Sequence, residues 1–216
     1  FNAPKILIEE LPKDKSVIIT EHRYPPHYAI METNGKFCVQ FVYFKNNDES
    51  KKVLKDWANK CIEWCYGRWE DNKFGDQKYL DEWPLKFNNI YILKNEGGGL
   101  APWNLYNYKL KENENNFEII RKKTKIKYPV VFYHFHDLRF YENKTIQLTG
   151  GYFMVPSYYK KLYYIYIDHL KKLEKKILEI DNSINPNCIL KKIKKEKNTN
   201  SKGFFRKLID KLTDKN

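Results

Sequence analysis

A near-continuous apolar run at residues 37–44 constrains the fold of this chain more than any other feature. Gln40 is its only strongly polar member, and aromatic and β-branched residues make up most of it, which is typical of a buried strand. Short apolar runs rich in β-branched residues, at 16–20 and 90–93, predict two more strands. Residues 49–69 repeat apolar side chains at three- and four-residue steps, which predicts an amphipathic helix. Strands that alternate with helices indicate an α/β fold.

The composition is that of a folded protein. Its 216 residues are 42% hydrophobic and 16% aromatic, enough for one domain with a substantial core. No run of about 18 apolar residues occurs, so we expect no transmembrane helix, and the first residues show no signal-peptide pattern. Four cysteines without CxxC spacing fit free thiols in a reducing compartment, so we expect a cytoplasmic protein.

The net charge of +13 is concentrated toward the C-terminus. Residues 171–216 hold 14 Lys and Arg against 6 Asp and Glu, whereas residues 1–170 hold 26 against 21. A nucleic-acid-binding domain needs a basic face on its folded part. Because most of the basic excess lies in a terminal appendage, we expect no nucleic-acid partner.

A polar turn follows the predicted helix. Gly75 permits a tight turn, and Asp76 and Gln77 leave it side by side, one an acceptor and the other both donor and acceptor. Such a pair suits a polyhydroxylated ligand, because each sugar hydroxyl both donates and accepts. The alternative is structural: Asp76 would cap a short helix that ends before Pro84.

Two loops carry further candidate substrate-binding residues. His22 and Arg23 follow the first predicted strand in a loop stiffened by prolines, where they would contact an anionic or sugar ligand or form surface ion pairs. Gln40 either completes a core network or points into a ligand site, because a buried amide needs partners. Trp103 and Asn104 follow three consecutive glycines and suit a sugar or a base, or else form a packed turn.

A third candidate group lies on a strand predicted at residues 128–138. His134 and His136 are two residues apart, so they would share one face of that strand. Two imidazoles there would bind a divalent cation or a diphosphate. The alternative is an aromatic core with polar tips.

The C-terminal third is predicted to be helical and basic. A stripe of apolar residues at helical spacing runs from residue 155 to 180, and a basic linker follows at 191–202. Residues 203–215 form an amphipathic pattern with basic flanks, which is typical of a helix that lies on an anionic membrane surface. The alternative is a helix docked on its own protein.

Together these segments resemble bacterial GT-A-type glycosyltransferases, the nucleotide-diphospho-sugar transferases related to the glycogenin-like retaining enzymes. The resemblance covers most of residues 1–140. The segments that carry it are Ile19-Thr20-Glu21-His22-Arg23, residues 35–44, Cys61-Ile62-Glu63-Trp64-Cys65-Tyr66, residues 73–84, Leu100-Ala101-Pro102-Trp103-Asn104 and Phe132-Tyr133-His134-Phe135-His136.

The resemblance implies roles for individual residues. It implies that Asp76 and Gln77 are catalytic residues that face the donor sugar and the reacting centre. It also implies that His134 is a ligand of manganese or magnesium, with His136 beside it. Cys38 stands where the family commonly has Asn, so a sugar contact of the family is missing at that position.

One departure from the family pattern is large. The Asp-x-Asp that holds the metal and the nucleotide diphosphate in this family does not occur in this sequence. We therefore expect residues 1–150 to be the C-terminal part of a GT-A mixed sheet flanked by helices. A helical extension at 151–190 and the basic linker with its amphipathic helix at 191–216 would follow. We also expect this chain alone to be inactive.

The function implied is transfer of a hexose from a nucleotide-diphospho-sugar to a glycan or lipid-linked acceptor in cell-surface polysaccharide synthesis. The enzyme would be cytoplasmic and associated peripherally with the inner membrane through its C-terminal helix. The alternative is a non-catalytic, basic and aromatic-rich module that binds a membrane surface or nucleic acid.

Overall fold

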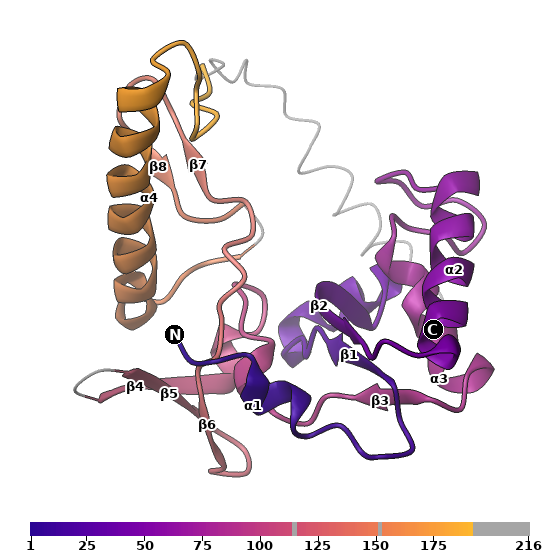
Figure 1. Ribbon diagram of the computed structural model, residues 1–216. Helices are drawn as coiled ribbons and strands as arrows, with labels where there is room; N and C mark the ends of the chain where they lie inside the picture. Colours follow the sequence, from indigo (N-terminus) through magenta and orange to yellow (C-terminus); the bar gives the residue numbers. More distant parts are fainter. Residues whose placement is uncertain (114–115, 151–152, 192–216) are drawn as a thin grey trace, which may run out of the picture.

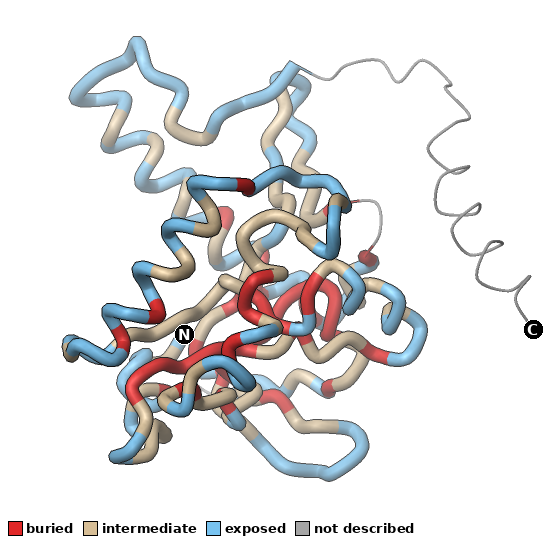
Figure 2. The backbone as a smooth tube through the Cα atoms, turned by 90° about the vertical axis from the view of Figure 1, so that its right-hand side faces the viewer, coloured by how far each residue is buried: buried red, intermediate tan, exposed pale blue. Residues whose placement is uncertain are grey.

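The computed structural model describes residues 1–113, 116–150 and 153–191. Figure 1 shows a body of small sheets with two arms, one containing α4 (Lys160–Ile180) and the other α2 (Asp48–Glu63). Buried residues gather in the body, while most of both helices is exposed or half-buried (Figure 2). The architecture is mixed α/β, which confirms the predicted class at that level.

The first sheet contains the three strands predicted from the apolar runs. β1 (Val17–Glu21) lies at its centre, paired antiparallel with β2 (Phe37–Phe44) and parallel with β3 (Ile90–Ile92). The pairing of β1 with β2 is irregular between Ile18 and Thr20. Because β1 is flanked on both sides, Val17 to Thr20 are fully buried, whereas most of β2 is half-buried.

Helix α2 begins as predicted but ends earlier. Asn47 caps it, because its Oδ1 accepts the backbone N–H of Ser50 at 3.0 Å. The helix was predicted to run to residue 69, and that bound is wrong: it ends at Glu63 and Trp64 is extended. Trp64 is held by tertiary contacts, since its carbonyl accepts the Tyr79 hydroxyl at 2.7 Å.

The N-terminal residues reach across the chain to a distant segment. The Phe1 amino group donates to the Val131 carbonyl at 3.0 Å, and the Asn2 side chain donates to the Val130 carbonyl at 2.7 Å. Helix α1 (Lys5–Ile8) then places Leu7 in a buried cluster that Val131 also joins. The two ends of the first 131 residues are therefore packed together.

The second sheet is an antiparallel meander of β4 (Tyr108–Asn113), β5 (Asn116–Arg121) and β6 (Lys127–Pro129). The strand predicted at 128–138 is wrong beyond Pro129. Backbone groups of the following residues bond to other segments instead, for example the Val131 N–H to the Gly97 carbonyl at 2.9 Å.

The third unit pairs β7 (Arg139–Phe140) with β8 (Ile146–Gln147) beside α4. The predicted C-terminal helix is present as α4. Its first turn enters the largest core cluster through Leu162 and Tyr163, next to the preceding Tyr159 and together with residues from 100–133. The body and the helical extension thus share one core.

Short helices connect these elements. They are the 3-10 helices η1 (Pro26–Asn34), η2 (Gln77–Glu82), η3 (Glu96–Gly98), η4 (Leu105–Asn107) and η5 (Ser157–Tyr159), and the α-helix α3 (Trp83–Lys86). In the described part of the chain, no helix has both the length and the apolar composition to cross a bilayer. The amphipathic helix predicted at 203–215 lies outside the described residues.

Candidate functional site

Trp103 is the centre of a cluster that joins three predicted site histidines. Its ring centroid lies 5.3 Å from that of His22, 5.4 Å from His134 and 5.5 Å from His136. The two later histidines are 5.7 Å apart. The strand predicted to align them is absent, but a tight turn, in which the His136 N–H donates to the His134 carbonyl at 2.8 Å, keeps both rings beside Trp103.

Hydrogen bonds fix the turn that carries Trp103. The indole N–H of Trp103 and the side-chain amide of Asn104 both donate to the His22 carbonyl, at 3.1 and 3.0 Å. Asn104 also donates to the Gly99 carbonyl and accepts the Ala101 N–H. Asn104 is fully buried and engaged by backbone, so the structure gives it a positioning role, and its predicted contact with a substrate stays a prediction.

Both His22 and His134 are held neutral. Burial lowers the pKa of His22 to about 4, and burial followed by the neighbouring His136 lowers the pKa of His134 to about 4. Nδ1 of His22 lies 3.2 Å from the Lys36 carbonyl, which can only accept, so Nδ1 carries the proton. Nε2 of His22 is therefore unprotonated at neutral pH and can act only as an acceptor.

The buried imidazole of His22 predicts a loss of stability in acid. Its pKa is about 4 when folded and about 6.5 when unfolded, so between these values the unfolded chain binds more protons. The stabilisation present above pH 6.5 is lost as the pH falls through 4, and we expect the free energy of unfolding to decrease by about 3 kcal/mol.

Urea unfolding of the wild type and of His22→Gln, at neutral pH and in acid, measures this difference. His22→Gln should reduce the pH dependence, whereas His169→Gln, at an exposed position of α4, should retain it in full. Asp81 and His134 are the titratable neighbours of His22, and both are present in all three proteins, so the part of the pH dependence that comes from His134 remains in His22→Gln. Equal pH dependence in wild type and His22→Gln would contradict the expectation.

Hydrogen bonds within the protein hold the turn that carries Asp76 and Gln77, the two predicted catalytic residues. Gly75 has φ +54°, a conformation that favours glycine. The Gln77 amide donates to the Asn34 carbonyl at 3.0 Å, and the Asp76 carbonyl accepts the Trp57 indole N–H at 3.0 Å. The Asp76 side chain makes no capping bond to η2, so the structure lacks the bond that the structural alternative required.

Cys38 connects this turn to the histidine cluster. Its side chain is buried in one cluster with Trp103 and Phe153. Burial, together with the charge of Asp76, raises its pKa to about 12. Cys38 thus shares a buried cluster with the indole around which the three histidines lie.

Arg23 and Gln40 meet beside Gly99 with unsatisfied polar groups. Nη2 of Arg23 donates to the Leu93 carbonyl at 2.6 Å, but its Nη1 and both amide atoms of Gln40 are buried without a hydrogen-bond partner among the described residues. A Cβ on Gly99 would lie 2.7 Å from Nη1 of Arg23 and 3.2 Å from Nε2 of Gln40. Buried groups of this kind need partners, so this corner can receive a polar ligand or ordered water.

The described residues offer only part of a metal site. His134 is neutral and supplies an imidazole, and His136 is near it. Within residues 1–113, 116–150 and 153–191, no group of three or more His, Cys, Asp or Glu side chains could hold a metal ion. Two imidazoles do not complete a coordination sphere for manganese or magnesium, which prefer oxygen ligands.

Two contributors were missed by sequence reasoning. Tyr24 stacks on His22 with ring centroids 4.9 Å apart, and Phe153 packs edge-on at 6.0 Å from Trp103. Their stacking depends on the left-handed backbone of Arg23 between them, with φ 55°, which the sequence does not signal. No signal in the sequence brings Phe153 to this cluster.

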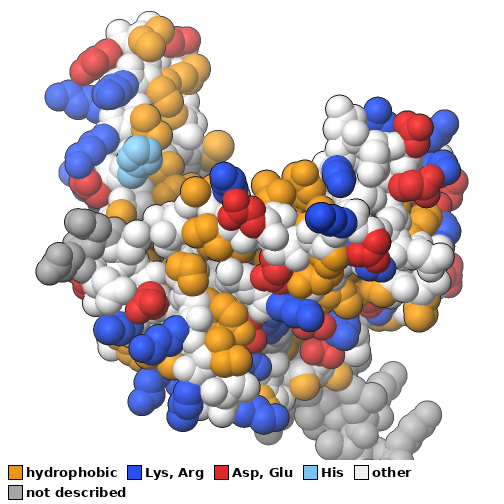
Figure 3. Space-filling model, turned by 60° about the horizontal axis from the view of Figure 1, so that its bottom comes forward, with side chains coloured by type: hydrophobic (Ala, Val, Ile, Leu, Met, Phe, Trp, Pro, Cys, Tyr) orange, Lys and Arg blue, Asp and Glu red, His pale blue; other side chains and the backbone are white. Residues whose placement is uncertain are grey.

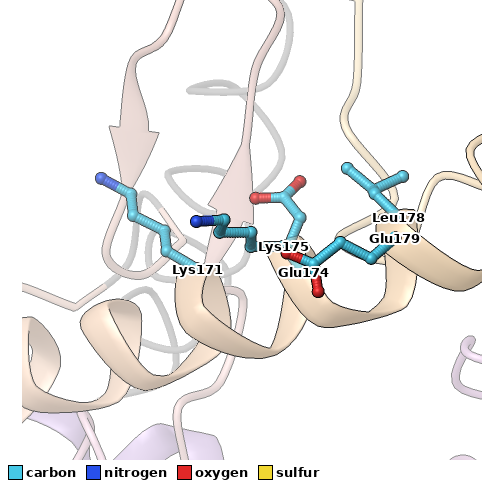
Figure 4. Close-up of a pocket in the computed structure, with 5 residues that line it drawn as sticks. All are labelled: Lys171, Glu174, Lys175, Leu178 and Glu179. Atoms are coloured by element: carbon cyan, nitrogen blue, oxygen red, sulfur yellow. The ribbon is translucent and has the colours of Figure 1, made fainter.

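Large surface depressions lie elsewhere. One is lined by residues of α4 alone, namely Lys171, Glu174, Lys175, Leu178 and Glu179 (Figure 4). Figure 3 shows a face that is hollowed between the arms of α4 and α2, where hydrophobic, basic and acidic side chains are mixed. A face with both charge signs suits a neutral or amphiphilic ligand better than a polyanion.

Comparison with known proteins gives relatives without an assigned role. The chain is similar to uncharacterized protein YfnD of Bacillus subtilis (strain 168), with 27% identity over 186 residues, which are 85% of this chain and 57% of YfnD. It is also similar to uncharacterized protein YfnF of the same organism, with 28% identity over 49% of this chain and 33% of YfnF. The chain therefore spans little more than half of one relative and a third of the other. No protein-family model and no solved structure matches.

Proposed function

We propose that this chain is the sugar-facing part of a glycosyltransferase that moves a hexose from a nucleotide-diphospho-sugar to a glycan or lipid-linked acceptor. The observation that carries the proposal is the convergence on Trp103. Cys38 belongs to the same buried cluster as this indole, and the ring centroids of three histidines lie 5.3 to 5.5 Å from it. Aromatic and imidazole groups that gather in one place suit recognition of a hydroxylated ring.

Each of these groups would have its own role in the proposed function. Asp76 accepts and Gln77 both donates and accepts, so together they would hold hydroxyls of the donor sugar and orient its anomeric carbon. Arg23 and Gln40 would supply the unpartnered N–H groups to the sugar or its phosphate. Trp103 and the rings around it would keep water from the reacting centre.

A divalent metal would supply charge stabilisation for the leaving diphosphate. The described residues provide at most His134 and His136 toward it, so no step is assigned to a metal here. Cytoplasmic location, peripheral attachment to the inner membrane and a role in cell-surface polysaccharide synthesis belong to the same proposal.

Titration of the chain with nucleotide sugars tests the proposal. We expect the 216-residue chain to bind one of UDP-glucose, UDP-galactose, dTDP-glucose or GDP-mannose, weakly, with a Kd of about 1 mM. Gln40→Ala should weaken that binding, whereas Asp14→Asn, at an exposed position, should not. We expect no transfer by this chain, even with manganese.

Two results would count against this proposal. If none of the four nucleotide sugars gives saturable binding by calorimetry, the rival assignment as a non-catalytic binding module becomes the better one. If the purified chain transfers hexose efficiently, the assignment of the nucleotide and metal sites to a missing Asp-x-Asp half is wrong.

A further inference from the structure

We infer that the loop before the Asp76–Gln77 turn is an acceptor subsite that binds a pyranose ring on the exposed face of Trp69. This inference rests on the proposed function for calling the sugar an acceptor. Trp69 and Tyr66 are both large and exposed, at 47% and 54% of their surface, and lie in one loop. Exposed aromatic side chains near a proposed reacting centre can bind a ligand.

The loop is rigid. The Gly75 N–H donates to the Tyr66 carbonyl at 2.9 Å and closes its neck. Its tip is a tight turn between Glu70 and Lys73, which exchange backbone hydrogen bonds at 3.3 and 2.8 Å. Asp71 and Asn72 at the tip both have positive φ, of 47° and 58°, as a type I′ turn requires. A preformed loop loses little entropy when a ligand binds.

The Trp69 ring is held from two sides. Its indole N–H donates to Oδ1 of Asn34 at 3.0 Å, and Nζ of Lys78 lies 5.7 Å from the ring centroid. Lys78 is itself fixed by an ion pair with Asp81 at 2.9 Å. Trp69 keeps 47% of its surface exposed, so part of the residue stays open to a ligand.

Asn34 links the Trp69 ring, the platform proposed for the sugar, to the proposed catalytic pair. Its side chain accepts from Trp69, and its carbonyl accepts from the Gln77 amide at 3.0 Å. The platform and Gln77 are therefore bonded to one residue. The groups assigned to the donor, Arg23 and Gln40, have buried polar atoms, whereas Trp69 is exposed, which places the second sugar on the solvent side.

The chemistry of the platform selects a sugar. One face of a pyranose ring presents mainly C–H groups, which lose contact with water on an aromatic face and meet its negative π surface. The Lys78 ammonium beside the ring can donate to hydroxyls of the bound sugar. The Tyr66 ring already has Arg68 at 4.4 Å over one face and Trp64 packed edge-on at 5.5 Å. Among the described residues, Trp69 has only Lys78 over it, at 5.7 Å, so Trp69 is the better stacking surface.

Indole N–H resonances in NMR test this subsite. Methyl pyranosides of glucose, galactose and N-acetylglucosamine, and uridine as a base, are titrated into the whole chain. The Trp69 resonance is the one that Trp69→Phe removes. We expect at least one pyranoside to shift it saturably, and Trp69→Ala to weaken binding by about tenfold or more. Trp69→Phe should bind with intermediate strength, because it keeps a ring but loses the bond to Asn34.

Ile62→Ala is the matched control, because Ile62 is 84% exposed near the end of α2 and makes no part of the loop. It should leave binding unchanged. The inference is overturned if no pyranoside shifts the Trp69 resonance, if Trp69→Ala binds as well as wild type, or if uridine alone binds there. Pyranoside binding that depends on Trp69 without any nucleotide-sugar binding would sustain the subsite and refute the transferase.

Discussion

Asp76→Asn is expected to lower hexosyl transfer by about 100-fold or more while leaving the thermal midpoint nearly unchanged. The measurement needs a longer form of the protein that is competent for transfer. The carboxylate makes no capping bond to η2, so its loss removes no visible support of the fold. Its charge contributes to the raised pKa of Cys38, a member of the buried cluster that contains Trp103.

Asp81→Asn is the matched control in the same turn. Its carboxylate accepts the backbone N–H groups of Lys36 and Phe37 at 2.8 and 3.4 Å and pairs with Lys78. Asp81→Asn should therefore lower the free energy of unfolding, by about 1–3 kcal/mol, and affect transfer less. If Asp76→Asn instead lowered stability by the roughly 1 kcal/mol of a lost helix cap and left transfer intact, Asp76 would be structural.

Gly97→Ala is expected to lower the free energy of unfolding by roughly 3 kcal/mol, because the added methyl group has no room. A Cβ on Gly97 would lie 1.8 Å from the carbonyl oxygen of Pro129 at the end of β6. The Gly97 carbonyl also accepts the Val131 N–H, so the two backbones cannot separate without losing a hydrogen bond. Urea unfolding monitored by circular dichroism measures the change.

Gly67→Ala is its control, since nothing lies within 4 Å of a Cβ at that position. We expect a change of less than about 0.5 kcal/mol there. Similar stabilities for the two variants would show that the approach of Gly97 to Pro129 is looser than described.

Gly97, Gly98 and Gly99 show how much of the candidate site could be predicted from the sequence. The sequence shows three consecutive glycines but not their neighbours: Pro129 meets Gly97, Leu7 meets Gly98, and Arg23 and Gln40 meet Gly99. These neighbours are distant in the chain, so only the tertiary fold reveals them. The strands at the first sheet were predictable because their apolar runs are local.

Elements defined by tertiary contacts were not predictable. The helix pattern continues past residue 63, yet α2 ends there because Trp64 is bound by Tyr79. The strand pattern continues past Pro129, yet the N-terminus and Gly97 take the backbone groups that a neighbouring strand would use. For the site, the sequence indicated the histidines and Trp103 separately, and their convergence required the fold.

The bonds from Phe1 and Asn2 to Val131 and Val130 also shape how this protein acquires its structure. They close a loop of about 130 residues, and the parallel pairing of β1 with β3 closes another of about 70. Forming contacts so remote in sequence costs loop-closure entropy before the contacts stabilise the chain, which slows folding. During synthesis, the cluster around Leu7 stays incomplete until Val131 has left the ribosome, so α1 depends for its burial on a residue more than 100 positions further along the sequence.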